Sequence, residues 1–577
     1  MTTTLEKIFP CVQWLRQYDK DQFTDDLVAA VIVTIMLVPQ SLAYALLAGV
    51  PAEVGLYASI LPLVFYMVFG SSRTLAVGPV AVVSLMTASS IGSMGLATQA
   101  EYLQAAVILA LLSGIFLVLL GILRFGFLAN FLSHPVVAGF ITASAIIIAV
   151  GQVRHILGIQ AGGDNLPEQL TSLLEGLPET STETLWVGGF ALVFLTAARL
   201  WLKQGLDRLG VPAFAAGIIV KAAPVIAVII TIAWAGLADL GSAGVALVGA
   251  IPAGLPNLAL PGIDRTMVQE LALPAILISV IGYVESVSVG KTLAAKRRQK
   301  INQNQELIGL GAANIGSALS GGFPVTGGFS RSVVNYDAGA RTPAAGLFTA
   351  IGIGVATMTL TGYLALLPKA TLAATIIIAV LGLVDFSILK KTWVYSRSDF
   401  IAVAATIVVT LLAGVETGVS TGVAASLVLH LYKTSRPHIA EVGEIKGTKH
   451  FRNVKRHQVE TFPTILQLRV DESLYFANAT HLEEEIFRNL NERPQLEHII
   501  LMCNAVNEID ISALEVLESM NEILSEQGVG FHLSEVKGPV MDHLEGTHFL
   551  AALNGQVFLS HYQAVQTLVL EDTLLSL

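Results

Sequence analysis

Charged side chains are scarce in this sequence, and their scarcity narrows the class of protein. Asp, Glu, Lys and Arg make up 13% of the chain, whereas soluble globular proteins carry about 25%. Hydrophobic residues make up 54%. A water-soluble domain does not bury that much apolar surface, so we expect lipid to surround most of the chain.

Several other features are missing. The formal net charge of -10 argues against a basic surface for nucleic acid. The only cysteines, Cys11 and Cys503, are too far apart to indicate a disulfide framework or a zinc site. Acidic and basic residues mix from Glu6 to Asp26, so we expect no cleavable signal peptide. There is no nucleophile–base pair, phosphate loop or metal-ligand cluster, so we predict no enzyme, cofactor or metal site.

Apolar runs recur over residues 27–432, and a spanning helix needs roughly 20 apolar residues. Hydropathy alone gives about 11 to 14 spans, and we predict 14. The clear runs are Leu27–Val50, Tyr102–Leu123, Pro135–Val153, Val211–Ala235, Leu271–Leu293, Leu347–Leu367, Ala370–Leu389 and Phe400–Ala413. Runs that are short or broken by Gly and Pro are Gly55–Phe69, Thr74–Met94, Leu307–Gly321, Pro324–Asn335 and Gly418–Leu431.

The distribution of Lys and Arg gives the predicted orientation. With 14 spans and a cytoplasmic start, the outer loops keep little beyond Arg154, Arg265 and Lys369. We therefore predict a multi-pass protein of the cell (inner) membrane with both termini in the cytoplasm. The predicted inner loops hold Arg73, Arg124, Lys203, Arg208, Lys291, Lys296, Arg297, Arg298, Lys300, Arg341, Lys390, Lys391 and Arg397.

After Lys433 the composition becomes that of a soluble protein. Strand-like and helix-like segments alternate from about Phe462, which is typical of one small sheet covered by helices. The strands are predicted at 464–469, 472–476, 498–503, 528–533 and 556–559, and the helices at 481–493 and 511–526. The predicted domains are an N-terminal cytoplasmic segment (1–26), a transmembrane transport domain (27–432), a linker (433–461) and a cytoplasmic α/β domain (462–577).

Two broken segments, Arg73–Met86 and Gly321–Asn335, place Gly and Pro before a helix-compatible run at membrane depth. Non-helical backbone is tolerated there only where it is buried in protein or lines a cavity. Each half-helix would direct unpaired N–H groups and a partial positive charge at whatever precedes it. Two such starts, near Pro79 and Phe329, predict an anion site, and matching breaks in two halves indicate an inverted-repeat transporter.

Two charges lie inside the apolar zone. Arg331, just inside the second half-helix, would add fixed positive charge to the anion site, although it could instead form a structural ion pair. Glu285 is the only acid in its apolar run, and Gly282 on the same helical face would permit close approach of another helix. Burial favours the neutral carboxyl and a nearby Arg favours the charged one, so Glu285 could carry a proton or remain paired with Arg331.

The first span carries polar residues on one face. Gln40 and Tyr44 are four positions apart, with Ser41 close by. Neutral donors of this kind bind an anion without holding it too tightly. They also commonly form hydrogen bonds between helices, which leaves a purely structural role open.

Four motifs together resemble the sulfate permease (SulP) family of anion transporters: PQSLAYALLAGVPAEVGLYAS, VGPVAVVSLM, GYVESVSVGKTLAAK and GGFPVTGGFSRSVVNYDAGARTPAAG. The resemblance covers 27–432. It implies 14 spans in two inverted sevens, a core domain that moves against a gate domain like an elevator, and a dimer. The substrate-binding residues implied are Gln40, Tyr44, Pro79, Val80, Ala81, Phe329, Ser330 and Arg331, with Glu285 as the proton-coupling residue.

The family also ends in a cytoplasmic STAS domain. Asn504–Met520 is similar to its signature loop and following helix, with Ser512 where related domains carry a phosphorylated serine. A plain helix N-cap at Asp510 or Ser512 is the alternative. A STAS domain also implies a possible cytoplasmic protein partner.

Several functions remain open at this point. Glu285 together with Arg331 resembles proton-coupled sulfate carriers, because sodium–bicarbonate members have Asp in span eight and lack the span-ten arginine. Sodium-coupled bicarbonate uptake, chloride/bicarbonate exchange and dicarboxylate transport are alternatives. A channel, a charge-moving membrane sensor or a membrane-tethered signalling module are further ones.

Overall fold

The computed structural model describes residues 9–130, 133–212, 216, 217, 219, 220, 222–259, 262 and 264–575. It divides into two compact units, Met1–Ser426 and Leu427–Leu577. Each unit is described by itself.

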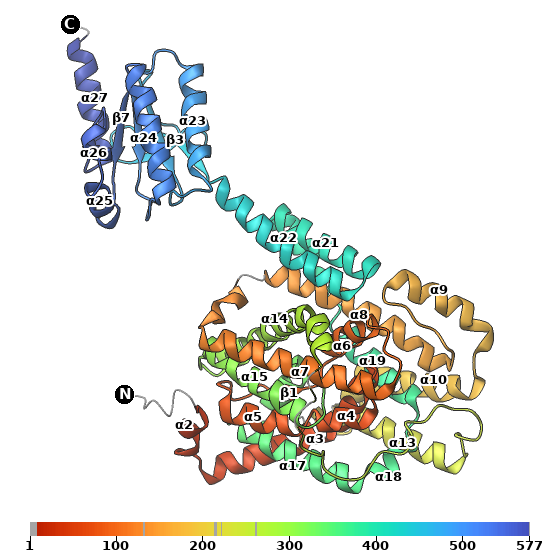
Figure 1. The fold of residues 1–577 in the computed structure, drawn as a ribbon. Helices are drawn as coiled ribbons and strands as arrows, with labels where there is room; N and C mark the ends of the chain where they lie inside the picture. Colours follow the sequence, from red (N-terminus) through yellow and green to blue (C-terminus); the bar gives the residue numbers. More distant parts are fainter. Residues whose placement is uncertain are drawn as a thin grey trace. The chain divides into compact units, whose positions relative to one another are not determined.

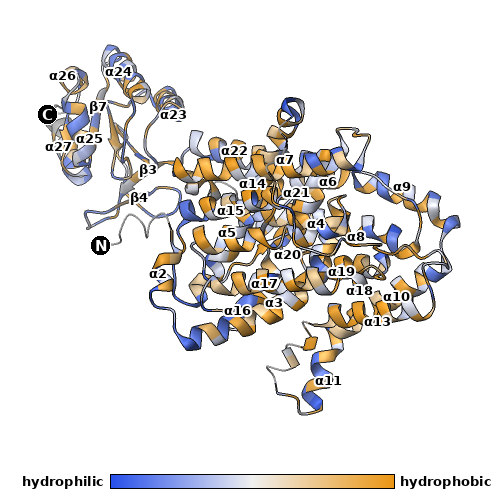
Figure 2. Ribbon diagram, turned by 60° about the horizontal axis from the view of Figure 1, so that its bottom comes forward, coloured by the Kyte–Doolittle hydropathy of each residue, from blue (hydrophilic) through white to orange (hydrophobic). Residues whose placement is uncertain are grey.

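The first unit is helical, and its helices are mostly hydrophobic (Figures 1 and 2). Its principal helices are α2 (Cys11–Leu15), α3 (Lys20–Leu47), α4 (Ala52–Tyr57), α5 (Leu61–Phe69), α6 (Ala81–Gly92), α7 (Gln99–Ile122), α8 (His134–Leu157), α9 (Leu166–Gly176), α10 (Thr182–Ala197), α11 (Lys203–Arg208), α13 (Ala223–Leu237), α14 (Arg265–Lys296), α15 (Gln303–Leu319), α16 (Phe329–Asp337), α17 (Ala344–Thr359), α18 (Thr361–Leu364), α19 (Lys369–Leu381), α20 (Ser387–Tyr395), α21 (Arg397–Ala413) and the start of α22 (Val415–Ser435).

Six helical segments among the described residues are long and apolar enough to cross a membrane, and four shorter ones are also apolar. Most of the predicted runs coincide with helices. The segment Thr182–Ala197 (α10) was not among the predicted runs. Between α8 and α10 lies α9, whose N-cap Asn165 accepts a hydrogen bond from Glu168 N.

Two short strands interrupt the helical unit. β1 (Val77–Gly78) pairs antiparallel with β2 (Thr326–Gly327), in the register Val77 with Gly327 and Gly78 with Thr326. Each strand is followed within three residues by a helix, α6 or α16. The antiparallel pairing therefore brings the two helix starts together and directs the helices apart.

The second unit contains a six-stranded sheet of order β4-β3-β5-β6-β7-β8. Side chains alternate between its faces: Leu466 and Leu468 pack with α23 and α24, whereas Ile465 packs with the opposite helix, α27 (Figure 1). The elements are β3 (Ile439–Glu444), β4 (Phe451–Asn453), β5 (Ile465–Val470), α23 (Ala479–Glu492), β6 (His498–Met502), α24 (Ile511–Glu526), β7 (Gly530–Ser534), α25 (Gly538–Glu545), α26 (Phe549–Ala552), β8 (Val557–Phe558) and α27 (His561–Leu575).

The range predicted as a linker, 433–461, contributes β3 and β4 to this sheet. The residues 472–476, predicted as a strand, form none; only Leu474 makes an isolated bridge, to Ile509. Asp510 is the N-cap of α24, since its carboxylate accepts a hydrogen bond from Ala513 N at 2.8 Å. Ser512 lies on the second residue of that helix, and its phosphorylation stays a prediction that mass spectrometry of the purified chain would test.

Two buried histidines make the stability of this unit depend on pH. Nδ1 of His532 accepts from Gln556 N at 3.0 Å, and Nδ1 of His561 lies 2.7 Å from Ser534 Oγ. Burial lowers the pKa of both imidazoles to about 4. The unfolded chain, with pKa values of about 6.5, therefore binds more protons than the folded one between about pH 4 and 6.5. The contribution of these histidines to the free energy of unfolding is fully present above this pH window and is lost as the pH falls through it.

We expect the unit 427–577 to lose about 1–2 kcal/mol of unfolding free energy per buried histidine between pH 7 and pH 5. Urea unfolding at the two pH values measures the loss. His561→Asn removes one titrating ring and should reduce the loss, whereas His543→Gln, at an exposed position, should not. An equal loss in both variants would contradict this assignment.

Candidate functional site

The site is built where the two half-helices begin. α6 starts at Ala81 with N-cap Val80, and α16 starts at Phe329 with N-cap Gly328; neither N-cap supplies a side-chain hydrogen bond. The first amides of an α-helix have no partner within the helix, and the helix dipole is positive there. Helix α6 thus starts two residues after Pro79, near which its start is predicted. Helix α16 starts at Phe329, as predicted.

A cavity of about 290 Å³ lies at these helix starts. Its walls come from α3, α6, α10, α13, α14, α16 and α19, and they include almost every residue predicted for the site. The predicted residues that line it are Gln40, Tyr44, Val80, Ala81, Glu285, Phe329, Ser330 and Arg331. Pro79 is buried and is not among the lining residues.

Arg331 is the central charge of the cavity. The residue is 1% exposed, and neither Nη1 nor Nη2 has a hydrogen-bond partner among the residues that the structure describes. The guanidinium lies between two glycines: a Cβ at Gly78 would be 2.7 Å from Nη1, and one at Gly328 would be 2.9 Å from Nε. Gly78 also has φ +156°, a backbone conformation that favours glycine. A buried guanidinium without partners strongly favours an anion beside it.

Glu285 faces the same cavity from α14 without pairing with Arg331. Of the described ion pairs, none joins the two groups within 4.0 Å, and Oε2 of Glu285 is buried with no hydrogen-bond partner in that part of the chain. This argues against the paired alternative. Gly282 does permit a close approach, but the neighbour is β2: Thr326 Oγ1 donates to Gly282 O at 2.6 Å.

Gln40 and Tyr44 add neutral polar groups on α3. They are 7% and 8% exposed, and within the described ranges neither side chain forms a hydrogen bond to another residue. Unsatisfied donors that line a cavity are available to a bound anion. In the part of the chain that the structure describes, Gln40 and Tyr44 therefore make no side-chain hydrogen bonds between helices, which was the structural alternative.

A second cavity, of about 440 Å³, shares Glu285 and Phe329 with the first. It extends along α14 towards the C-terminal end of that helix, where Lys291 lies in its wall, and includes His134 and Asp385. Phe329 is 50% exposed. The anion cavity thus continues towards the side of the membrane on which α14 ends.

The loop before β1 is held by a carboxylate that the sequence pattern did not single out. Glu306 on α15 is fully buried and accepts from Tyr66 Oη at 2.7 Å, Ser71 N at 2.8 Å and Ser72 N at 2.9 Å. It fixes the segment that leads into β1 and therefore positions Gly78 beside Arg331. Because Glu306 precedes an ordinary amphipathic run, only its burial distinguishes it.

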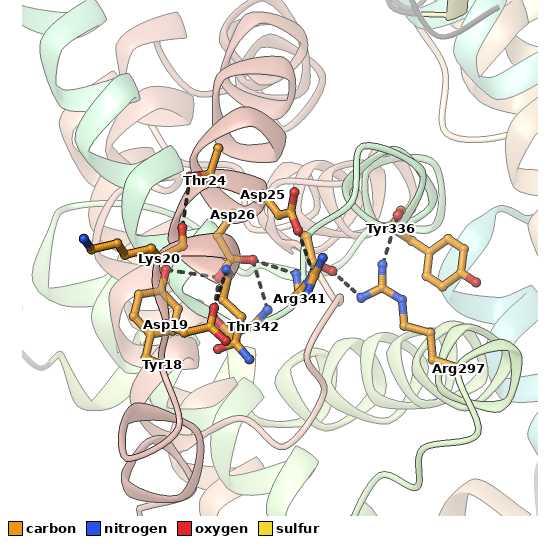
Figure 3. Close-up of polar contacts among 12 residues, drawn as sticks. Tyr18, Asp19, Lys20, Thr24, Asp25, Asp26, Arg297, Tyr336, Arg341 and Thr342 are labelled. Atoms are coloured by element: carbon orange, nitrogen blue, oxygen red, sulfur yellow. Dashed lines mark hydrogen bonds and ion pairs between the residues drawn. The ribbon is translucent and has the colours of Figure 1, made fainter.

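The loop after α16 is held by a second buried carboxylate (Figure 3). Asp26 on α3 accepts from Arg341 N at 2.6 Å, Thr342 N at 3.0 Å, Thr342 Oγ1 at 2.5 Å and Tyr18 Oη at 3.2 Å. Arg297 donates to two carbonyls of the same stretch, including Tyr336 O at 3.2 Å. The C-terminal end of the Arg331-bearing segment is thus fixed by Asp26 and Arg297, and the segment that leads to Gly78 is fixed by Glu306.

We expect Asp26→Asn to lower the apparent melting temperature of the detergent-solubilised protein clearly, because an amide NH2 would face donors and leave them unpaired at about 1–3 kcal/mol each. Asp25→Asn is the matched control. Asp25 pairs with Arg341 at 2.6 Å, but the two side chains are 37% and 53% exposed, so we expect a loss below about 1 kcal/mol. Equal melting temperatures for the two variants would contradict the anchoring role of Asp26.

Among the described residues, no group of three or more His, Cys, Asp or Glu side chains gathers as a metal site.

Comparison with known proteins decides the family. The model of the sulfate permease family matches residues 23–406, which is more than half of the chain, and the STAS domain model matches residues 456–564. The chain belongs to the sulfate permease family. It is therefore an anion transporter of the membrane with a C-terminal STAS domain, and its family is one of transporters rather than enzymes.

The alignments with relatives of this permease cover almost the whole chain. It is 34% identical over 595 residues to "Sulfate transporter 4.1, chloroplastic" of Arabidopsis thaliana, covering 99% of this chain and 85% of that protein. A probable sulfate transporter of Mycobacterium tuberculosis is 30% identical over 563 residues, covering 96% and 97%. The solved structure of SLC26A9 matches with a TM-score of 0.90 at 22% identity, over 99% of this chain and 94% of that one. That match shows the shared fold.

Proposed function

We propose that this permease takes up sulfate together with protons. The proposal rests on the buried guanidinium of Arg331, which lies at two converging helix starts and whose Nη1 and Nη2 have no partner among the described residues. An oxyanion with several acceptor atoms satisfies both terminal nitrogens, which fit such an anion bidentately. The relatives named as sulfate transporters support sulfate over other anions.

Glu285 supplies the coupling in this proposal. It lines both the anion cavity and the cavity that leads away from it, and it forms no ion pair with Arg331 among the described residues. When a doubly charged anion enters, a proton on Glu285 offsets the added charge. When the anion leaves, Glu285 releases the proton along the same route.

The wider architecture of the proposal follows the family. The chain has 14 spans in two inverted repeats, with α6 and α16 as the third span of each, and it works as an elevator in which a core carries the anion past a gate. It forms a homodimer in the cell (inner) membrane, with both termini and the STAS domain in the cytoplasm. Limited proteolysis of oriented vesicles tests the termini, since cleavage after Ser435 from the outer face would contradict this orientation.

Competition in proteoliposomes tests the substrate. Labelled sulfate uptake is measured at two pH values with an excess of bicarbonate, succinate or chloride, and with sodium replaced by potassium. We expect unlabelled sulfate to compete best, faster uptake at the lower external pH and no response to sodium. Sodium stimulation with strong competition by bicarbonate would favour sodium–bicarbonate uptake, while uptake indifferent to the pH gradient would contradict proton coupling.

A further inference from the structure

A third cavity lies beyond the anion site on the same two helices. It measures about 210 Å³ and includes Leu47 on α3 and Leu85 on α6. Leu47 follows Tyr44 by one helical turn, and Leu85 follows Ala81 by one turn. The cavity therefore lies towards the C-terminal ends of α3 and α6.

An apolar layer separates this cavity from the anion site. Leu47, Leu85 and Ile148 line the third cavity, and they pack in the same hydrophobic cluster as Tyr44 and Ala81, which line the anion cavity. A charged ion does not cross packed aliphatic side chains without a rearrangement, because it would lose its hydration there. The third cavity is thus the closed side of the pathway in this structure.

Polar groups at the end of α8 form the other wall of this cavity. Gln152 is 6% exposed, lines the cavity, and forms no side-chain hydrogen bond within the described ranges. Arg154 donates from Nη1 to Ala161 O at 2.7 Å and from Nε to His155 Nε2 at 3.3 Å. In the described part of the chain, no carboxylate lies within the 4.0 Å of Arg154 that an ion pair requires. One cation and one buried amide are therefore available to a ligand.

One acidic residue, Asp164, also lies in this wall. It belongs to the loop between α8 and α9 and is exposed. Its negative charge opposes anion binding, so removing Asp164 and removing Arg154 should change the affinity for an anion in opposite directions. Removing Arg154 should weaken the binding of an anion, and removing Asp164 should strengthen it.

We propose that this cavity is a second binding site for a small inorganic oxyanion, on the side of the membrane where α3 ends. Arg154 and Gln152 bind the anion there before the layer of Leu47, Leu85 and Ile148 opens. The buried Oε1 of Gln169, which has no partner among the described residues, lies in the same cavity wall. The inference rests on the proposed function, because sulfate is the anion that it places at this site.

Protection of an introduced thiol tests the site directly. Ser89 lines the cavity, so Ser89→Cys is made in the full chain with Cys11 and Cys503 replaced by serine. A membrane-impermeant thiol reagent is applied to proteoliposomes with increasing sodium sulfate, and with gluconate at equal ionic strength as the salt control. Sulfate should slow the labelling. Arg154→Gln should raise the half-protecting concentration about tenfold, and Asp164→Asn should lower it.

Three further variants complete the test. Arg265→Gln is the matched control: Arg265 is exposed at the start of α14 and should leave protection unchanged. Gln152→Met removes a donor without touching the contact between Arg154 and Ala161, so it should weaken protection even if Arg154→Gln perturbs that loop. Arg331→Gln should strongly weaken sulfate transport and leave protection intact, which separates a failure of this inference from a failure of the proposed function.

Absence of protection by sulfate in the parent chain would overturn the proposal. Protection that Arg154→Gln and Gln152→Met both leave unchanged would also overturn it. A rise in the half-protecting concentration with Asp164→Asn, instead of a fall, would contradict the electrostatic part.

Discussion

Replacing Arg331 with glutamine is expected to lower the affinity for sulfate about 100- to 10,000-fold, since each of two charge-assisted hydrogen bonds contributes about 1.5–3 kcal/mol. The size of the effect follows from the surroundings of the side chain. It is 1% exposed, and Nη1 and Nη2 have no partners among the described residues. The removed interactions are therefore those that an anion makes, and initial rates of labelled sulfate uptake over a wide concentration range measure the loss.

Arg331→Lys and Arg297→Gln are the informative comparisons. Lysine keeps the charge but not the bidentate geometry, so its affinity should fall between those of the wild type and Arg331→Gln. Arg297 donates to Tyr336 O at 3.2 Å and does not line the anion cavity, so Arg297→Gln should affect stability more than sulfate affinity. Equal affinity in Arg331→Gln and the wild type would remove the basis of the proposed anion site.

Replacing Glu285 with glutamine is expected to abolish sulfate accumulation driven by a pH gradient. A difference of two pH units supplies about 2.7 kcal/mol per proton, enough for about 100-fold accumulation at zero membrane potential. The variant keeps the shape of the side chain but cannot exchange a proton. Sulfate accumulation in proteoliposomes, with the potential held at zero by a potassium ionophore, measures the effect.

Sulfate exchange is the internal control for this variant. With sulfate on both sides and no gradient, Glu285→Gln should still exchange labelled for unlabelled sulfate, because Arg331 and the two helix starts are intact. Loss of exchange together with accumulation would mean that Glu285 is needed for binding or folding rather than coupling. Accumulation equal to that of the wild type would exclude Glu285 as the proton carrier.

The site could be predicted from the sequence because its residues violate the rules of apolar helices. Gly and Pro before Ala81 and before Phe329 mark broken helices, and Arg331 and Glu285 are charges inside long apolar runs. These signals are local, so no knowledge of the fold is required to find them. The structure brings the predicted residues to one cavity, with Pro79 outside its wall.

The supports of the site could not be predicted in the same way. Asp26 and Glu306 precede or begin ordinary helical patterns, and their roles depend on partners more than 200 residues away in sequence, such as Thr342 and Tyr66. Gly78 resembles any other glycine until its closeness to Arg331 is known. Long-range contacts of this kind leave no periodic trace in the sequence.

In the second unit, too, some elements could be predicted from the sequence and others could not. Helix α24 was predicted with the bounds that the structure gives, because its apolar period is regular. Strands β3 and β4 were missed within the predicted linker, because β4 has only three residues and β3 includes Glu441 and Glu444. Their place in the sheet comes from pairing with β5 and with each other, a tertiary property.

The most direct test of the anion site is an experimental structure of the full chain with selenate in place of sulfate. The proposal predicts selenium density in the cavity lined by Gly328, Arg331 and α3, with oxyanion atoms about 2.7–2.9 Å from the guanidinium nitrogens of Arg331. The density should be lost from this cavity in Arg331→Gln. If the protein transports selenate but saturating selenate leaves no density in this cavity, the proposed anion site at Arg331 is contradicted.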